Sequence, residues 1–219
     1  MKIAIDGPAG AGKSSIAKLA AKELGFIYID TGAMYRASAL YAIENGIEIC
    51  EKSFTKDVLD KIKIDIKYDE DGQRILLCGK DVSKRIREAD VSIGASDIAV
   101  IPAVRIKLVE LQRELAAGNN VIMDGRDIGT YVLPDAELKI YLTASTEERA
   151  NRRLKELREK GQTADFEKVK RDIEYRDKND SEREFAPLRQ AEDAILLDST
   201  DMTVDEVKNR ILELAKEKM

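Results

Sequence analysis

The chain has 219 residues, a formal net charge of -5 and no histidine. The lack of histidine excludes Ser/His/Asp and Cys/His triads and every His-ligated metal, and leaves carboxylates, lysine, arginine and backbone dipoles for any chemistry. The acidic balance argues against broad nucleic-acid binding, although the 37 Lys and Arg residues could gather in a cleft for small anions. The length fits one domain, or one core with insertions.

Neither export nor membrane spanning is expected. The first residues run directly into a short apolar strand, and no apolar run approaches the roughly 18 residues of a membrane span. Cys50 and Cys78 lack the spacing of a zinc site or a disulfide framework, so we expect two reduced structural thiols. These features predict a cytoplasmic protein with no membrane partner.

The first quarter of the chain predicts strand, loop, helix, strand, helix. Residues 2–6 form a short apolar run before a glycine-rich loop, and residues 13–24 carry apolar side chains at helical spacing. Gly25 is placed to end that helix, and a short strand follows at 26–29. Thr31 is the expected N-cap of a helix that runs to about Asn45.

Residues 62–82 have a different character. Apolar residues alternate on both sides of Asp71 and Gly72, which predicts an antiparallel hairpin inserted into the alternating pattern. Its strands are expected to build a wall of the protein, and most of the apolar stripe around Met34 and Tyr35 is expected to be core.

The remaining chain returns to alternation of helix and strand. Helical patterns cover about 88–100 and 103–117, separated at Pro102, with Gly118 as the stop. The further predicted elements are strands within 120–129, 137–145 and 194–200, and helices from Thr146, over 165–179 and over 203–217. Short apolar strands that alternate with helices indicate an α/β fold whose parallel sheet is covered on both faces.

A phosphate-binding loop lies between the first strand and the first helix. Gly7, Pro8, Ala9, Gly10, Ala11, Gly12, Lys13 and Ser14 fit G-x-x-x-x-G-K-[ST]. The glycines allow the loop amides to point inward at a positive helix end, where they form a nest for an anion. Lys13 is expected to reach the β- and γ-phosphates, and Ser14 to supply a hydroxyl to Mg²⁺. Asp6 stays ambiguous, with a structural role at the strand end as one option.

Arginines beside carboxylates indicate a second phosphorylated substrate. They recur at predicted loop ends, and planar guanidinium groups bind phosphate in a bidentate way that lysine cannot match. These arginines are Arg36, Arg105, Arg126, Arg149, Arg152, Arg153, Arg176 and Arg183. Phosphoryl transfer depends mainly on in-line positioning and charge neutralisation, so it needs no histidine. Each cluster alone could instead be a solvated surface face.

Six segments together resemble the bacterial cytidylate kinases, which transfer phosphate from ATP to CMP or dCMP. They are IDGPAGAGKSS, IDTGAMYRA, DVSKRIR, MDGRDIGT, ERANRR and RDKNDSEREFAPL, and the resemblance that they carry extends over nearly the whole chain. The resemblance implies a P-loop three-layer fold with a five-stranded parallel sheet, a short lid near 149–165 and a monophosphate-binding region enlarged by the antiparallel insertion. The implied division is a core of 1–30, 118–148 and 190–219, a monophosphate-binding region of 31–117, and a lid with its following helix at 149–189.

The resemblance also implies roles for individual residues in CMP binding. It assigns the acceptor phosphate to Arg36, Arg126 and Arg183, the sugar to Tyr35, Arg176 and Asp180, and the base to Ser96, Arg105 and Asp127, with Thr31 nearby. Cytosine presents an N4 donor that suits a carboxylate, beside N3 and O2 acceptors that suit Arg and Ser. Uracil would set acceptor against acceptor and donor against donor, so a preference for CMP over UMP is expected.

The donor side is assigned in the same way. Asp124 ends an apolar strand as a Walker-B residue does, and it is expected to hold Mg²⁺ beside Ser14 through water; a simple strand-end cap is the other option. Arg149, Arg153 and Arg158 look like lid arginines that close on the transferring phosphate, and the sequence leaves open which of them contacts it. The expected ATP-binding residues are those of the loop from Gly7 to Ser15 with Arg153 and Arg158, and the expected catalytic residues are Lys13, Arg126, Arg149, Arg153 and Arg183.

Two other classes of protein compete with this interpretation. A small-molecule kinase, such as a shikimate or gluconate kinase, shares the loop and the size but has no need of a cytosine-matching Ser96, Arg105 and Asp127. A regulatory protein that senses ATP has little use for a second phosphate site. The expected partners are therefore ATP, CMP and dCMP, the expected cofactor is Mg²⁺, and a monomer is predicted.

Overall fold

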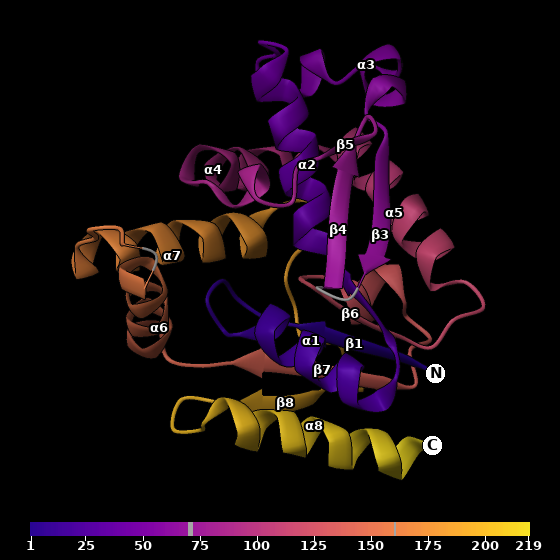
Figure 1. The fold of residues 1–219 in the computed structure, drawn as a ribbon, viewed down its shortest axis with the longest axis vertical. Helices are drawn as coiled ribbons and strands as arrows, with labels where there is room; N and C mark the ends of the chain where they lie inside the picture. The colour runs from indigo at the N-terminus through magenta and orange to yellow at the C-terminus, as the bar shows by residue number, and fades with distance from the viewer. Residues whose placement is uncertain (70–71, 160) are drawn as a thin grey trace. The chain divides into compact units, whose positions relative to one another are not determined.

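The computed structural model describes residues 1–69, 72–159 and 161–219. The chain forms two compact units: residues 1–28 with 118–219, and residues 29–117. Figure 1 follows the chain through the elements of each unit, and we describe the two units separately. No helix in the described part of the chain is long and apolar enough to cross a membrane.

A five-stranded sheet carries the first unit, and its strand order is β2-β6-β1-β7-β8. Its strands are β1 (Lys2–Asp6), β2 (Ile27–Asp30), β6 (Val121–Gly125), β7 (Leu138–Thr143) and β8 (Ile195–Asp198). β1 is central and pairs in parallel with both β6 and β7, in a register that sets Asp6 against Gly125 and Tyr141. The apolar run of β1 is buried from Ile3 onward, as expected for a strand covered on both faces. The predicted parallel sheet of five strands is confirmed.

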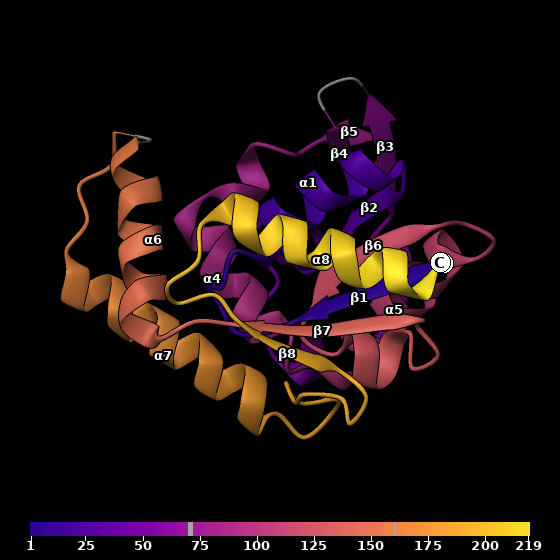
Figure 2. The same ribbon diagram turned by 90° about the horizontal axis from the view of Figure 1, so that it is seen from below.

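Helices α1 (Lys13–Leu24) and α8 (Val204–Lys218) share one apolar core with the central strands. Ile16 of α1 and Ile211 of α8 are buried there beside Ile5 and Ile140, and Figure 2 shows α8 along the strands. Gly25 ends α1 in the left-handed conformation that a glycine adopts without steric cost, as the sequence predicts. α1 is thereby fixed on the sheet directly after the glycine-rich loop.

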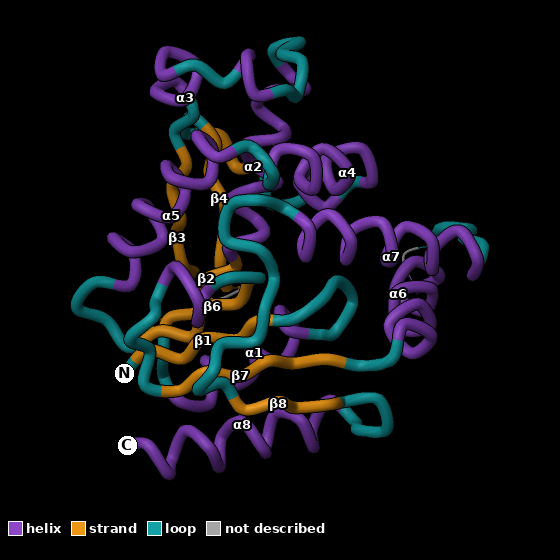
Figure 3. The backbone as a smooth tube through the Cα atoms, turned by 180° about the vertical axis from the view of Figure 1, so that it is seen from behind, coloured by secondary structure: helices purple, strands orange, loops and turns teal. Residues whose placement is uncertain are grey.

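Helices α6 (Thr146–Glu159) and α7 (Phe166–Glu182) form a pair that follows β7. Ala150 and Leu154 of α6 pack with Val169 and Ile173 of α7 in a small core of their own, and Figure 3 shows the two helices together beyond the end of β7. The rest of both helices is strongly charged, and ion pairs of Arg149 with Asp177 and of Lys170 with Glu147 join the helices beside this narrow apolar stripe.

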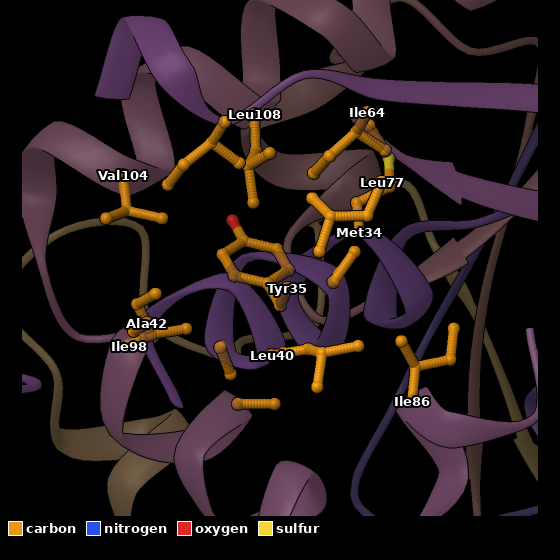
Figure 4. Close-up of a cluster of buried hydrophobic side chains, with 14 of the residues drawn as sticks. Met34, Tyr35, Leu40, Ala42, Ile64, Leu77, Ile86, Ile98, Val104 and Leu108 are labelled. Atoms are coloured by element: carbon orange, nitrogen blue, oxygen red, sulfur yellow. The ribbon is translucent and has the colours of Figure 1, made fainter. Parts of the chain in front are cut away.

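The described residues of the second unit form four α-helices and an antiparallel sheet. The helices are α2 (Thr31–Glu44), α3 (Lys56–Lys61), α4 (Ala89–Ile98) and α5 (Pro102–Ala116), and the sheet is made of β3 (Ile64–Asp69), β4 (Gly72–Leu77) and β5 (Lys80–Asp81) in that order. Met34 of α2 lies beside Ile64 and Leu77 of the sheet, in a core that also includes Leu40 (Figure 4). The insertion therefore supplies one wall of this core, as predicted.

Some local details differ from the sequence prediction. The N-cap of α2 is Asp30 and not Thr31, which is the first helical residue; the Asp30 carboxylate accepts a hydrogen bond from the Ala33 amide at 2.8 Å. Asp and Thr are both good N-caps, and the extended conformation of the strand continues through Asp30. α3 and β5 were not predicted, because both are too short to show a period. The turn residue Asp71 lies outside the described residues.

A test of this fold concerns the N-terminus of α8. Thr203 and Glu206 form a reciprocal capping box, in which each side chain accepts a hydrogen bond from the other residue's amide. Thr203→Ala should lower the free energy of unfolding by about 1 kcal/mol in urea titrations, because the amide of Glu206 loses its acceptor. Thr203→Ser keeps the hydroxyl and should stay near the parent protein; an equal loss in both variants would contradict the role of the cap.

Candidate active site

The glycine-rich loop joins β1 to α1 and has room only for glycine at its first position. At Gly7 a Cβ atom would lie 1.9 Å from the backbone oxygen of Leu142, so any side chain there collides with β7. Gly10 has φ +76°, and a Cβ atom there would lie 3.2 Å from Cβ of Arg149. The loop is therefore packed tightly against β7 and α6, and its shape depends on those contacts.

Side chains hold both backbone polar groups of Ala9, its amide and its carbonyl. Its amide donates to Oδ1 of Asp177 at 3.0 Å, and its carbonyl accepts from Nη1 of Arg149 at 2.9 Å. The same Nη1 donates to Oδ2 of Asp177 at 2.5 Å. Arg149 comes from α6 and Asp177 from α7, so this helix pair is bonded to the loop by charged side chains.

Lys13 lies folded over the loop and is almost fully buried. Its Nζ donates to the carbonyl of Pro8 at 2.8 Å, and the side chain is only 6% exposed. Burial, together with the nearby Arg126 guanidinium, lowers the pKa of Lys13 to about 7. The ammonium therefore lacks a counter-charge strong enough to offset its desolvation.

Three oxygen-bearing side chains meet beside the start of α1. Ser14 donates to Oδ2 of Asp124 at 2.8 Å, and the hydroxyl of Tyr28 donates to Oδ1 at 2.9 Å. Asp124 ends β6 and is 4% exposed. The Ser14 hydroxyl and the Asp124 carboxylate, which the sequence predicts as a pair, are thus in direct contact.

Asp6 has a structural role at the end of β1. Its carboxylate accepts hydrogen bonds from the amides of Ile128 at 2.8 Å and Gly129 at 2.7 Å, in the short helical turn Ile128–Val132 that follows β6. Burial raises its pKa to about 6 even though the two amide bonds favour the charged form. The open question about Asp6 is answered by these contacts: it orders the loop that carries Arg126 and Asp127.

Arg126, Asp127, Asp180 and Arg183 form one network of alternating charge, in which all but the half-buried Arg126 are buried. Nε of Arg126 lies 2.6 Å from Oδ2 of Asp180, and Nη2 of Arg183 lies 3.3 Å from Oδ1 of Asp127. Arg183 is also 3.7 Å from the second oxygen of Asp180, and its Nε and Nη2 both donate to the carbonyl of Ala186. Four residues predicted at the acceptor nucleotide are therefore brought together within the first unit.

The cations of this unit crowd one another. We call Lys13, Arg126, Arg153 and Arg176 the cation cluster. Burial lowers the pKa of Arg176 from its usual value, and the positive charges of Arg153 and Arg126 lower it further. Arg176 makes no hydrogen bond or ion pair with any residue among 1–69, 72–159 and 161–219. Asp172 and Asp180 offset these cations only in part, and a half-buried guanidinium without a hydrogen-bonding partner among the described residues indicates a site for an anion.

The other predicted lid arginines differ in burial. Arg153 pairs with Glu156 on its own helix at 2.7 Å and is 32% exposed, and Arg158 is exposed. Arg149 is 5% exposed and donates to the carbonyls of Ala144 and Ala9, to the hydroxyl of Thr146 and to Asp177. The structure therefore places Arg149 under the loop and leaves Arg153 and Arg158 at the surface of α6.

The second unit holds the remaining predicted residues. Arg36 donates to Oδ2 of Asp30 at 2.9 Å, and the Arg105 guanidinium lies 5.4 Å from the centre of the Tyr35 ring. Arg105 is 1% exposed and donates to the carbonyl of Ala99, which fixes a buried charge in place. Thr31 is buried at the start of α2, and Ser96 is half-buried on α4.

These motifs have a counterpart among known proteins. The family model for cytidylate kinase matches residues 3–217. The chain belongs to the cytidylate kinase family. It is 56% identical to a cytidylate kinase of Caldicellulosiruptor saccharolyticus over 214 residues, which cover 98% of this chain and 95% of that protein. It is 49% identical to a cytidylate kinase of Lactobacillus gasseri over 218 residues, which cover all of this chain and 95% of that protein.

A solved structure supports the fold of this cytidylate kinase family member. An uncharacterised protein from Eubacterium ventriosum superposes with a TM-score of 0.55 at 14% identity, over 99% of this chain and 98% of that one. At this identity the likeness concerns the fold alone, and it agrees with the sheet order and the flanking helices described above.

Three residues of the site carry no expected role in the sequence. Asp177 holds the loop, Asp30 holds Arg36, and Gln73 of the insertion accepts a hydrogen bond from the Asp30 amide at 3.1 Å. Asp30 and Asp177 lie in two of the segments that resemble the family, close in sequence to arginines of the site. That proximity is a signal from which their roles could have been predicted. Gln73 shows no signal in the sequence, because its role depends on how the hairpin packs.

The depressed pKa of Lys13 predicts proton uptake on nucleotide binding. At pH 8 the Lys13 amine is mostly neutral. A triphosphate bound at the loop favours the charged amine, so the pKa of Lys13 rises and the protein takes up about one proton. Calorimetric titration with ATP and Mg²⁺ in Tris and in HEPES should show the difference in heat that this uptake produces.

Two variants make the measurement specific. Lys13→Arg, which stays charged, should bind without uptake, whereas Lys22→Gln on the exposed part of the same helix should behave as the parent protein. Binding of ATP by the parent protein with equal heats in both buffers would contradict the prediction.

Proposed function

We propose that the chain transfers the γ-phosphoryl group of ATP to CMP and dCMP, giving ADP with CDP or dCDP. The observation that carries this proposal is the cation cluster, in which Arg176 has cationic neighbours and no hydrogen-bonding partner among the described residues. Phosphoryl transfer needs charge neutralisation and in-line positioning, which guanidinium groups and loop amides supply without histidine. Membership of the cytidylate kinase family supports ATP as donor and CMP as acceptor.

On the donor side, the loop from Gly7 to Ser15 holds the triphosphate, with Lys13 at the β- and γ-phosphates. The positive φ angles at Gly10 and Gly12 turn neighbouring amides inward as an anion nest requires. Arg153 and Arg158 are the arginines that approach the phosphates. Both are at the surface of α6, and Arg153 gives up a single exposed ion pair when it moves.

Ser14 and Asp124 fit an Mg²⁺ site. Their oxygens are in contact at 2.8 Å, and hard oxygen donors are what this ion prefers. Mg²⁺ keeps several waters and takes one or two carboxylates together with substrate phosphates, so two protein oxygens are enough for such a site. Bound there, Mg²⁺ would offset the negative charge that the transferring phosphoryl group spreads over its oxygens.

On the acceptor side, the roles follow the family pattern. Arg36, Arg126 and Arg183 bind the phosphate of CMP. The sugar is contacted by Tyr35, Arg176 and Asp180, and the base by Ser96, Arg105 and Asp127 with Thr31 nearby. The bonds of Asp30 to Arg36 and of Ala99 to Arg105 support these roles, because they fix each guanidinium before a ligand arrives. A place in pyrimidine nucleotide metabolism follows from this substrate, and a cytoplasmic monomer stays a prediction.

The first test measures ADP release with and without CMP. A kinase that couples the two substrates should release ADP rapidly with CMP and at least about a hundredfold more slowly without it, because water is excluded from the assembled site. An ATP-sensing protein would show no stimulation by CMP, and a small-molecule kinase would respond to shikimate or gluconate instead. Either result would overturn the proposal.

The second test compares CMP with UMP. If Asp127 reads the N4 amino group, kcat/KM should favour CMP by about tenfold to a hundredfold for each unpaired buried group, and Asp127→Ala should remove most of that preference. Asp135→Ala, an exposed carboxylate after the same strand, is the matched control and should leave the ratio unchanged. An unchanged ratio in Asp127→Ala would show that another group reads the base.

A further inference from the structure

Asp177 is a carboxylate with two partners and no assigned role. It lies on α7 between Arg176 and Lys178, with its side chain 24% exposed. One oxygen accepts the Ala9 amide of the glycine-rich loop, and the other accepts Nη1 of Arg149. Both oxygens of one carboxylate are thus used to join three chain segments that are far apart in the sequence.

The loop peptide that Asp177 holds has little other support. Gly10, the next residue, has a positive φ angle, and glycine on its own would let the Ala9–Gly10 segment sample other conformations. The Ala9 carbonyl is bonded to Arg149, and Arg149 is in turn held by Asp177 and by the Ala144 carbonyl. Removal of the carboxylate therefore loosens the amide directly and the carbonyl indirectly.

The charge of Asp177 matters as well as its geometry. Its negative charge favours the charged form of Arg126, and it neutralises the buried Arg149. Without it, the Ala9 amide would lose its acceptor and Nη1 of Arg149 would keep only the Ala9 carbonyl, which is a costly arrangement for partly buried donors.

We propose that Asp177 is a positioning residue for the donor triphosphate: it fixes the Ala9 peptide and Arg149, so that the loop amides keep the orientation that binds phosphate. This role concerns the donor site of the proposed function, and its kinetic test rests on that function. Asp177 acts through the loop, so it affects the binding of ATP before any chemistry occurs. It does not act on the acceptor nucleotide.

The test is Asp177→Asn, which keeps the shape but loses the charge and sets an amide donor against Arg149. Because loop contacts to the triphosphate exist in the ground state as well as the transition state, the KM for ATP should rise about tenfold while kcat and the KM for CMP change less than about twofold. A role in stability alone would lower the active fraction, and so kcat, and would leave both KM values unchanged. That pattern would overturn the proposal.

Calorimetric titration of ATP in the absence of CMP separates this proposal from the proposed function. A Kd for ATP that weakens about tenfold in Asp177→Asn supports the role of Asp177 even if no transfer to CMP is found, and an unchanged Kd rejects it even if transfer is found. Glu174→Gln, an exposed carboxylate on the same helix, is the matched control and should change neither value. A second variant, Asp177→Ser, removes the bond to Arg149 without placing a donor amide there and should weaken ATP binding in the same way.

Discussion

The arrangement of the site follows from one electrostatic constraint: several cations lie close together in a poorly solvated region. Arg126 lowers the pKa of Lys13, and Arg153 and Arg126 lower the pKa of Arg176, against a smaller opposite effect of Asp172 and Asp180. Holding like charges in a region of low dielectric costs free energy, which the rest of the fold must supply. A polyanionic ligand removes that cost, so the free energy of its binding includes the relief of repulsion already present in the free protein.

Carboxylates make this crowding tolerable, and each one does so at a defined place. Asp180 stands between Arg126 and Arg183, Asp127 pairs with Arg183, and Asp177 pairs with Arg149. Alternation of charge keeps the guanidinium groups in fixed orientations and leaves part of each one available. Without the carboxylates, repulsion would push the guanidinium groups apart. With a carboxylate on every guanidinium donor, no donor would be left to bind phosphate. Arg176, without such a partner in the described chain, shows where the alternation stops.

Short-range patterns in the sequence predict the parts of the fold that depend on interactions between residues close together in the chain. Glycines at positive φ, apolar periods and strand-end acidic residues are properties of short segments, and they predict the parallel sheet, the longer helices and the placement of Asp124 beside Ser14. Asp6 and Asp177 are different, because their partners lie 122 and 168 residues away in the chain. No spacing rule reaches that far. The prediction of Thr31 as N-cap was wrong for another reason. Asp30 and Thr31 are both suitable caps, and the cap is Asp30 because the extended strand conformation continues through that residue.

Arg149 shows how a motif-based role changes once the contacts are known. As part of ERANRR it was predicted to close on the transferring phosphate, which assumes a guanidinium that is free to move. Its side chain instead donates to four acceptors and packs against Gly10, so a move toward phosphate would break bonds that also hold the loop. Two of those bonds are buried and two are partly buried, and a buried donor that loses its acceptor costs about 1 to 3 kcal/mol. Arg153, one helical turn later, loses only an exposed ion pair when it moves. The contacts of Arg149 thus fix the loop, and the closing of an arginine of this helix on the phosphate stays a prediction that Arg153 meets at a lower cost in broken bonds.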